Sequence, residues 1–154
     1  MQLSEFLDFD SIRLDLSAGN KRNLLNMLSQ ISAQRLGLDP ALIADAIGER
    51  ERLGSTGFGG GVAIPHGKLP QIERIYALVA RLAQPIDYKA IDGEKVDLVF
   101  LLLSPPDAGA EHLKALAAVS RLVRHAATIE KLRGARSRDA LAAVLLGADE
   151  RDAA

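Results

Sequence analysis

Hydrophobic residues recur along the chain with two periodicities, a period of two that is typical of strands and a period near 3.6 that is typical of helices. Residues 11–16 and 75–83 follow the strand rhythm, and the second of these strands is expected to end at Pro85. Residues 96–103, VDLVFLLL, are apolar on both faces. This pattern predicts a central strand that is covered on both sides.

Four segments carry apolar residues at helical spacing, and two of them have recognisable N-caps. The segments are residues 17–37, 39–54, 110–125 and 137–147. Asp39 is expected to cap the second helix, with Pro40 at its first position, and Ser137 to cap the last one. Residues 128–134 are interpreted as a short turn. The residues expected to face the core from the third helix are Leu113, Leu116, Val119 and Val123. Strands interleaved with helices predict an α/β fold with helices on both faces of a sheet.

The length of 154 residues fits a single domain, expected over residues 1–147 with a polar tail at 148–154. Disorder is expected only in that tail, since the chain is 48% apolar and 25% charged. The formal net charge is −1, so no long-range positive field exists to attract nucleic acid or an anionic membrane. Both are disfavoured as partners.

The absence of cysteine excludes disulfides, thiolate catalysis and cysteine-ligated zinc, and fits a reducing compartment. The acidic N-terminus has no signal-peptide pattern, and the apolar run at 98–103 is too short to cross a bilayer. A cytoplasmic protein without membrane insertion is expected.

Residues 54–68, GSTGFGGGVAIPHGK, are unusually rich in glycine. Their spacing fits neither a Walker loop nor a dinucleotide fingerprint. Glycine backbone can still approach an anion, and Ser55 and Thr56 add hydroxyl donors beside the basic residues Arg50, Arg52 and Lys68. The run is therefore a candidate cradle for a phosphoryl group. A glycine-rich surface turn with a solvated basic rim is the alternative.

The three histidines of the chain differ in their sequence context. His125 lies near the end of a helix, where it is interpreted as a surface residue favoured by the helix dipole. His112 lies in the first turn of the helix after the buried strand, at the sheet end where α/β proteins bind ligands. It is either a neutral site residue or a capping or surface residue. His66 follows the apolar VAIP segment, a candidate short strand that would present its imidazole at a sheet edge.

A neutral imidazole at residue 66 could attack phosphorus, since histidine is among the side chains that form covalent intermediates. A second neutral histidine and nearby donors would then stabilise the transferred group. Two histidines could also ligate a metal ion, but no third ligand stands at a recognisable spacing. Neither a metal nor a cofactor is predicted.

The run LGSTGFGGGVAIPHGK closely resembles the active-site signature of the fructose/mannitol class of phosphotransferase-system enzyme IIA domains, most of all their nitrogen-regulatory branch. A second block, AIDGEKVDLVFLLLSPPDAGAEHLKAL, is similar to the same family, so the resemblance covers nearly the whole chain. It implies a mixed, mostly parallel sheet flanked by helices on both faces.

The resemblance implies that His66 accepts a phosphoryl group through Nε2 and that His112 is the second active-site histidine. Ser55, Thr56 and Gly57 match the part of the signature that lines the site. Arg50 and Lys68 flank the site, and we expect them to contact phosphate or a partner.

The implied partners are a nitrogen-related, HPr-like phosphocarrier as donor, an enzyme I homologue upstream, and regulatory targets such as potassium-transport or sensor-kinase proteins. The protein would be a phosphohistidine carrier and regulator rather than a classical turnover enzyme. A sugar-specific IIA component that passes phosphate to a IIB domain is an alternative within the family. A non-catalytic binding module and, less favoured, a phosphate-ester hydrolase are the alternatives outside it.

Overall fold

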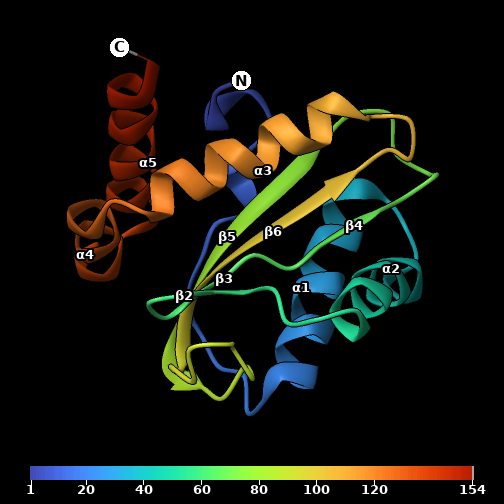
Figure 1. Cartoon of the computed structure of the whole chain (residues 1–154), viewed down its shortest axis with the longest axis horizontal. Coiled ribbons are helices and arrows are strands. Elements are labelled where there is room, and N and C mark those ends of the chain that lie inside the picture. The colour runs from blue at the N-terminus through green and yellow to red at the C-terminus, as the bar shows by residue number, and fades with distance from the viewer. Residues whose placement is uncertain (154) are drawn as a thin grey trace.

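The computed structural model describes residues 1–153 and shows a six-stranded sheet between two layers of helices (Figure 1). The strands are β1 Arg13–Leu16, β2 Gly57–Gly59, β3 Val62–Ala63, β4 His66–Lys68, β5 Tyr76–Ile86 and β6 Val96–Ser104. The helices are α1 Lys21–Leu36, α2 Pro40–Arg52, α3 Ala110–Val123, α4 Ala126–Gly134 and α5 Arg138–Ala153, preceded by the short 3-10 helices η1 Leu3–Glu5 and η2 Phe9–Ser11.

The sheet is mixed and has the order β1-β5-β6-β3-β2, with β4 also paired to β6. β1 runs parallel to β5, and both β3 and β4 run parallel to β6. The β5–β6 and β2–β3 pairs are antiparallel. The parallel pairings outnumber the antiparallel ones, which confirms the predicted mixed, mostly parallel sheet.

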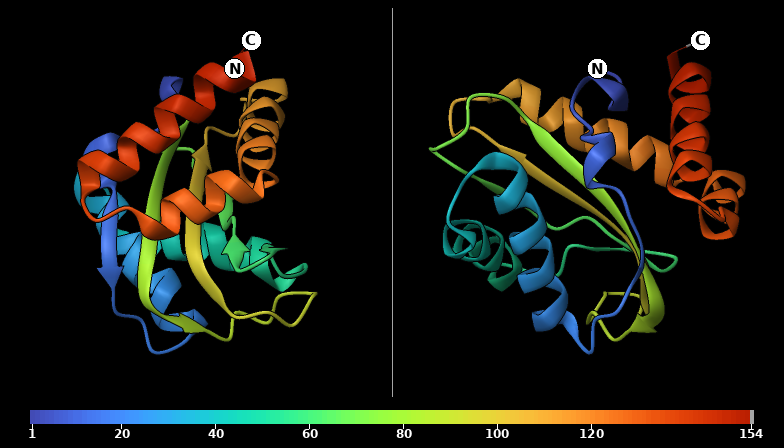
Figure 2. Two further views of the ribbon diagram at one scale, coloured as in Figure 1. Left: turned by 90° about the vertical axis from the view of Figure 1, so that its left-hand side faces the viewer. Right: turned by 180° about the vertical axis from the view of Figure 1, so that it is seen from behind.

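Strand β6 is the centre of the molecule, as its two apolar faces predicted. Phe100 packs in a core that includes residues of α3, α4 and α5, whereas Leu101 packs in a core that includes residues of α1 and α2. Successive side chains of a strand point to opposite faces, so one apolar strand serves both layers. Figure 2 shows the two helical layers on opposite sides of the strands.

Helix boundaries follow the capping residues seen in the sequence. The Asp39 side chain accepts a hydrogen bond from the Ala41 N–H at 3.0 Å, and Pro40 occupies the first position of α2. The Ser137 hydroxyl accepts from the Ala140 N–H at 3.0 Å. These contacts satisfy N–H groups that a helix N-terminus otherwise leaves unpaired. Both predicted caps are confirmed.

Two local predictions are wrong for reasons that the packing explains. Pro85 does not end its strand, because β5 continues to Ile86 and its pairing with β6 is irregular between Arg81 and Ile86. A residue without an N–H is tolerated there. Residues 128–134, predicted as a turn, belong to α4, where Ile129 is buried in the core.

Leu113 was expected to face the core, but it is 67% exposed. The inward stripe of α3 begins one residue earlier, at His112, and continues through Ala115, Val119 and Leu122. A buried histidine thus occupies the first core-facing position of the helix. Leu116, Val119 and Val123 pack against the core as predicted, so only Leu113 departs from the expected stripe.

The predicted polar tail is helical as far as the structure describes it. Helix α5 continues to Ala153, and Asp149 is buried where it accepts hydrogen bonds from the Leu3 and Ser4 N–H groups at 2.8 and 2.7 Å. The prediction of disorder is therefore wrong for residues 148–153, and Ala154 lies outside the described residues.

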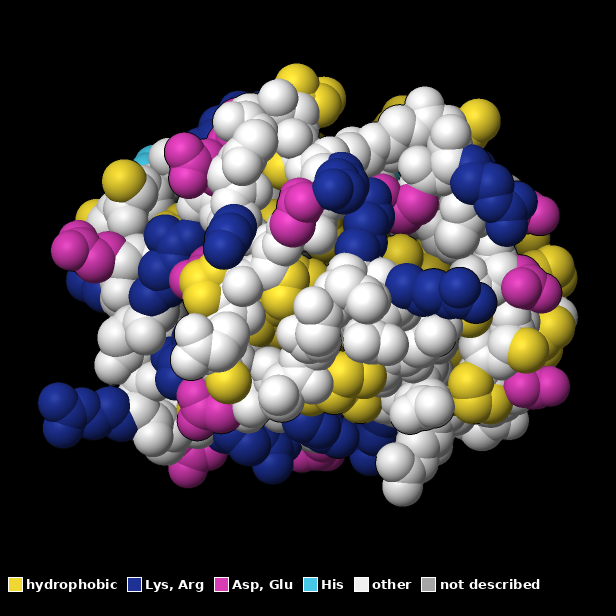
Figure 3. All heavy atoms as spheres, turned by 90° about the horizontal axis from the view of Figure 1, so that it is seen from below, with side chains coloured by type: hydrophobic (Ala, Val, Ile, Leu, Met, Phe, Trp, Pro, Cys, Tyr) yellow, Lys and Arg dark blue, Asp and Glu magenta, His cyan; other side chains and the backbone are white. Residues whose placement is uncertain are grey.

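Basic and acidic side chains are interspersed on the face shown in Figure 3, with apolar groups between them. This mixture agrees with the balance of 19 basic and 20 acidic residues. None of the helices formed by residues 1–153 has both the length and the apolar character that a membrane crossing needs.

Candidate functional site

Three elements bring a pair of histidines together where β4 and β6 end. Strand β4 places His66 opposite Leu102 of β6, and the first turn of α3 supplies His112. The two imidazole centroids lie 5.7 Å apart with an interplanar angle of 52°. Loops that follow the carboxyl ends of parallel strands are the usual place for ligands in α/β sheets. The structure thus joins two histidines that lie 46 residues apart in the sequence.

The hydrogen bonds of His66 define its tautomer. Nδ1 lies 2.8 Å from the Ile64 carbonyl oxygen, which can only accept, so Nδ1 carries the proton. Nε2 accepts a hydrogen bond from Arg50 Nε at 3.2 Å. A neutral ring has one donor and one acceptor nitrogen, and here the acceptor lone pair is on Nε2.

The environment of His66 favours the neutral ring. Burial is the main cause that lowers its pKa below the ordinary value of 6.5. The Ile64 carbonyl opposes this effect, the positive charge of Arg50 adds to it, and the negative charge of Glu51 again opposes it. An uncharged imidazole is therefore available near neutral pH.

His112 is buried, with 8% of its surface exposed, and its Nδ1 lies 2.6 Å from the hydroxyl oxygen of Ser104. Burial lowers its pKa, and the nearby His66 and Lys68 lower it further. Its interpretation as a surface residue is therefore wrong. Ser104, the last residue of β6, was missed by the sequence analysis, although a polar residue at the end of an apolar run was a visible signal.

Arg50 connects the histidine to the glycine-rich segment. Its Nε donates to His66, and its Nη1 donates to the Gly54 carbonyl at 2.9 Å. Of the other basic residues in this region, Lys68 is exposed on β4, two residues from His66, and Arg52 is exposed at the end of α2. His125 is half-exposed at the N-cap of α4, near Asp152, and does not join the pair.

The hydroxyl groups predicted to hold phosphate have other partners in this structure. The Thr56 side chain is buried and bonds to the Glu51 carboxylate and the Tyr88 hydroxyl. The Ser55 hydroxyl accepts from the Gly57 N–H at 3.1 Å. Glu51 and Tyr88 were not identified from the sequence, and Tyr88 carried no signal because it lies 37 residues from Glu51.

Part of the glycine-rich run forms a turn that lies away from His66. Gly59, Gly60 and Gly61 have φ of 114°, 63° and 84° and form the turn between β2 and β3. Val62 pairs with Leu98, four residues before the partner of His66, which places this turn about 13 Å or more from the histidine along the strand. Three of the six glycines in residues 54–68 therefore form a hairpin turn away from the histidine.

Gly67 has a packing role beside the site. A Cβ atom at this position would lie 3.0 Å from the carbonyl carbon of Ala46 and 3.1 Å from its oxygen. The missing side chain lets α2 approach β4 closely, which brings Arg50 within hydrogen-bonding distance of His66.

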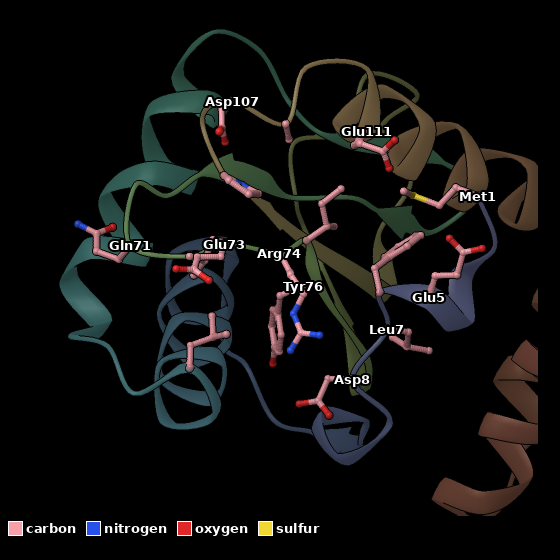
Figure 4. Close-up of a pocket in the computed structure, with 16 residues that line it drawn as sticks. Met1, Glu5, Leu7, Asp8, Gln71, Glu73, Arg74, Tyr76, Asp107 and Glu111 are labelled. Carbon is pink, nitrogen blue, oxygen red and sulfur yellow. The ribbon is translucent and has the colours of Figure 1, made fainter.

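A groove of about 780 Å³ is lined by residues before β5 and after β6, and its lining contains neither histidine (Figure 4). It runs between the N-terminal segment, residues 71–76 and residues 105–111. Its acidic lining residues are Glu5, Asp8, Glu73, Asp107 and Glu111. Within residues 1–153 no group of three histidine, cysteine, aspartate or glutamate side chains is arranged to hold a metal ion.

The sheet order and the pair of close histidines, one buried and one partly buried, define a class of small α/β protein with an imidazole site at the end of a sheet. The family model described as "Phosphoenolpyruvate-dependent sugar phosphotransferase system, EIIA 2" matches residues 5–147. The chain belongs to this family of type 2 enzyme IIA domains, as its two sequence blocks predicted.

Within this family, the chain is similar to proteins named as nitrogen regulatory proteins. A nitrogen regulatory protein of Bradyrhizobium diazoefficiens is 43% identical over 145 residues, which are 94% of this chain and 95% of that protein. One of Escherichia coli is 37% identical over 92% of this chain and 87% of the relative. The crystal structure of nitrogen regulatory protein IIA-Ntr from Neisseria meningitidis has a TM-score of 0.88 at 32% identity, over 93% of this chain and 98% of that one.

Proposed function

We propose that His66 accepts a phosphoryl group on Nε2 and that the protein acts as a phosphorylation-dependent regulator of the nitrogen-related phosphotransferase system. The observation that carries the proposal is the pair of hydrogen bonds at His66, Nδ1–H to the Ile64 carbonyl and Arg50 Nε–H to Nε2. They support a neutral imidazole whose nucleophilic nitrogen faces a cation, and the ring of a second histidine lies 5.7 Å away. The names of the relatives support the regulatory role.

In the transfer, the Nε2 lone pair attacks phosphorus and forms a P–N bond, while the bond between phosphorus and the donor's leaving atom breaks with its electrons going to the donor. No proton has to leave Nε2, because the ring proton is on Nδ1 and stays hydrogen-bonded to the Ile64 carbonyl oxygen. The positive charge that develops on the ring is stabilised by this carbonyl. Catalysis of such a step is mainly positioning and electrostatic stabilisation.

The neighbours of His66 have complementary tasks in this proposal. Arg50 releases Nε2 and turns its guanidinium to the phosphoryl oxygens, with which it can form charge-assisted hydrogen bonds. His112, held by Ser104, supplies a second neutral imidazole beside the transferred group. Lys68 is proposed to contact phosphate or a partner from the rim.

Residues 55–57 are proposed to line the phosphoryl site by packing, since the N–H groups of Thr56 and Gly57 donate to Glu51 and to the Ser55 hydroxyl. The hydroxyls of Ser55 and Thr56 already have partners, and the Thr56 N–H donates to Glu51. Close packing of Gly57 against Ala90, whose Cα would lie 2.9 Å from an added Cβ, fixes the course of this segment.

The proposed donor is an HPr-like phosphocarrier, and the proposed output is a change in affinity for regulatory targets such as potassium-transport or sensor-kinase proteins. A phosphoryl group adds roughly −1.5 to −2 charges near pH 7. Added beside Arg50 and Lys68, this charge would reverse the local potential of the surface that a target meets.

The test is incubation of the protein with phosphoenolpyruvate, enzyme I and an HPr-like carrier, followed by intact mass measurement and mapping of the modified residue. We expect one acid-labile, base-stable phosphoryl group on His66 and none in His66→Ala. His112→Ala should accept the group more slowly, and His125→Ala is the matched control that removes a distant imidazole. Equal labelling of His66→Ala and the wild type would disprove the assignment.

The family description, which names sugar phosphotransferase systems, supports a second candidate, a sugar-specific IIA component that passes its phosphoryl group to a IIB domain. Phosphorylated protein would then lose its label to a IIB domain within a sugar-dependent chain. A module that binds its targets equally well with and without phosphate would instead support a pure binding role.

A further inference from the structure

The carboxylate of Glu51 is a buried junction one residue away from Arg50. Its side chain is 7% exposed and lies 2.7 Å from Lys21 Nζ. It accepts hydrogen bonds from the Tyr88 hydroxyl at 2.9 Å, from the Thr56 N–H at 3.2 Å, and from the Thr56 hydroxyl. A buried charge is tolerated only when it is paired and hydrogen-bonded, and these contacts meet that demand.

The partners of Glu51 come from elements that are distant in sequence. Lys21 begins α1 and lies 4.3 Å from the ring centroid of Tyr88, which is itself fully buried. Burial and the charge of Glu51 both raise the pKa of Tyr88, so its hydroxyl remains a donor. The junction therefore fixes the main chain at Thr56 relative to α1, α2 and the segment after β5.

A continuous series of hydrogen bonds leads from this junction to His66. Glu51 accepts from the Thr56 N–H, the Thr56 carbonyl accepts from the Ile64 N–H at 2.9 Å, and the Ile64 carbonyl accepts from His66 Nδ1–H at 2.8 Å. The N–H and the carbonyl of one residue belong to two different peptide groups joined at Cα, so this series fixes the positions of the groups along it. The carbonyl that selects the tautomer of His66 is thereby tied to a buried negative charge.

Arg50 and Glu51, which are neighbours on α2, thus act on different ring nitrogens of His66. Arg50 contacts Nε2 directly, and Glu51 acts on Nδ1 through the main chain of Thr56 and Ile64. Their charges also act on the ring in opposite directions, since Glu51 raises the pKa of His66 and Arg50 lowers it. Two opposite charges on one turn of α2 thus act on the same imidazole.

We propose that Glu51 is a positioning residue for phosphoryl transfer, which orients His66 and fixes its Nδ1–H tautomer through the main chain of Thr56 and Ile64. The inference rests on the proposed function for the transfer step alone. The tautomer and the orientation are properties of the unphosphorylated protein and can be measured separately.

The primary experiment compares the wild type with Glu51→Gln by ¹⁵N NMR of the histidine rings, without any phosphoryl donor. Glutamine keeps an acceptor but removes the charge. We expect a larger fraction of the Nε2–H tautomer and a lower pKa of His66 in the variant. Glu49→Gln removes the same charge from an exposed position of α2 and is the matched control. Unchanged ring signals in a folded Glu51→Gln protein would overturn the proposal.

Glu51→Asp keeps the charge near Lys21 but withdraws the carboxylate from Thr56 by one methylene. It serves as the second variant if Glu51→Gln does not fold, and the same ring signals decide the result. Thr56→Val removes the hydroxyl but retains the N–H and carbonyl that join the series, so its tautomer should match the wild type. A change in Thr56→Val as large as that in Glu51→Gln would assign the effect to the hydroxyl and overturn the main-chain route.

The kinetic arm uses the phosphocarrier as donor. Misplacing a reacting group by about 1 Å can slow a reaction roughly 100-fold, so a partial loss of orientation should lower kcat about tenfold in Glu51→Gln while KM for the carrier stays near the wild-type value. An unchanged kcat would contradict the positioning role. If the wild type accepts no phosphoryl group, the proposed function fails, while the NMR result on Glu51 still stands.

Discussion

The rings of His66 and His112 lie 5.7 Å apart, and burial lowers the pKa of both. Protonation of one disfavours protonation of the other, since the charge of His66 lowers the pKa of His112. The closeness of the two rings therefore favours a state in which both are neutral, which a site that accepts an electrophilic phosphoryl group requires.

This pairing makes the stability of the protein depend on pH in a definite direction. The folded state holds both imidazoles at a pKa below 6.5, so the unfolded chain binds more protons as the pH falls from 6.5 through the folded values. The contribution of the two neutral imidazoles to the free energy of unfolding is complete above pH 6.5 and is lost as the pH falls through the pKa values of the folded state. Urea denaturation should give a lower free energy of unfolding at pH 5.5 than at pH 7.5, and a smaller difference in a His66→Gln/His112→Gln variant. An equal pH difference in both proteins would refute the linkage.

Replacement of Arg50 by methionine should affect both the basicity and the reactivity of His66. The variant loses a positive charge that lowers the pKa of His66, so that pKa should rise. It also loses the donor that we propose for the phosphoryl oxygens, and removal of one such donor slows related reactions by roughly 100-fold or more. NMR titration and the rate of phosphoryl acceptance measure the two effects.

The exposed neighbour Arg52 provides the control for this prediction. Arg52→Met removes the same charge two residues further along α2 but breaks no contact with His66. Arg50→Lys should give an intermediate rate, because an ammonium group keeps the charge without the planar guanidinium geometry. Equal rates in Arg50→Met and Arg52→Met would show that the contact with Nε2 has no role.

The sequence was sufficient to predict the parts of the site that depend on the apolar pattern of one strand or on residues close to it in the chain. The apolar faces of residues 96–103 were sufficient to place β6 at the centre, and the position of His112 after that strand was sufficient to place it at the end of the sheet. The junction at Glu51 could not be predicted, because Tyr88 is 37 residues away and only the packed fold brings its hydroxyl to the carboxylate. The division of the glycine run could not be predicted either, because composition does not distinguish the hairpin turn at residues 59–61 from an anion cradle.

Gly67→Ala should lower the stability of the protein and also change the pKa of His66. The added Cβ would meet the main chain of Ala46 at 3.0 Å, so α2 must move away from β4. Overpacking of this kind destabilises a protein by about 1–3 kcal/mol. The same movement should lengthen the contact between Arg50 and His66 and raise the pKa of His66 toward its ordinary value.

Chemical denaturation and NMR titration test this prediction, and Gly147 supplies the control. Gly147 lies in α5, where an added Cβ meets no atom within 4 Å. Gly147→Ala should stabilise the protein by roughly 0.5–1 kcal/mol through the helix preference of alanine. A Gly67→Ala protein as stable as the wild type would show that α2 adapts without loss.

The last turns of α5 should contribute to stability through Asp149, although the sequence of residues 148–154 looks like a solvated tail. The Asp149 carboxylate accepts from the Leu3 and Ser4 N–H groups and joins the two ends of the chain. Asp149→Ala leaves these N–H groups without their partner, and an unsatisfied buried donor costs about 1–3 kcal/mol. Urea denaturation should show this loss for Asp149→Ala. The neighbouring exposed variant Glu150→Ala should stay within about 0.5 kcal/mol of the wild type. Equal midpoints for the two variants would mean that the contact between the chain ends adds nothing to stability.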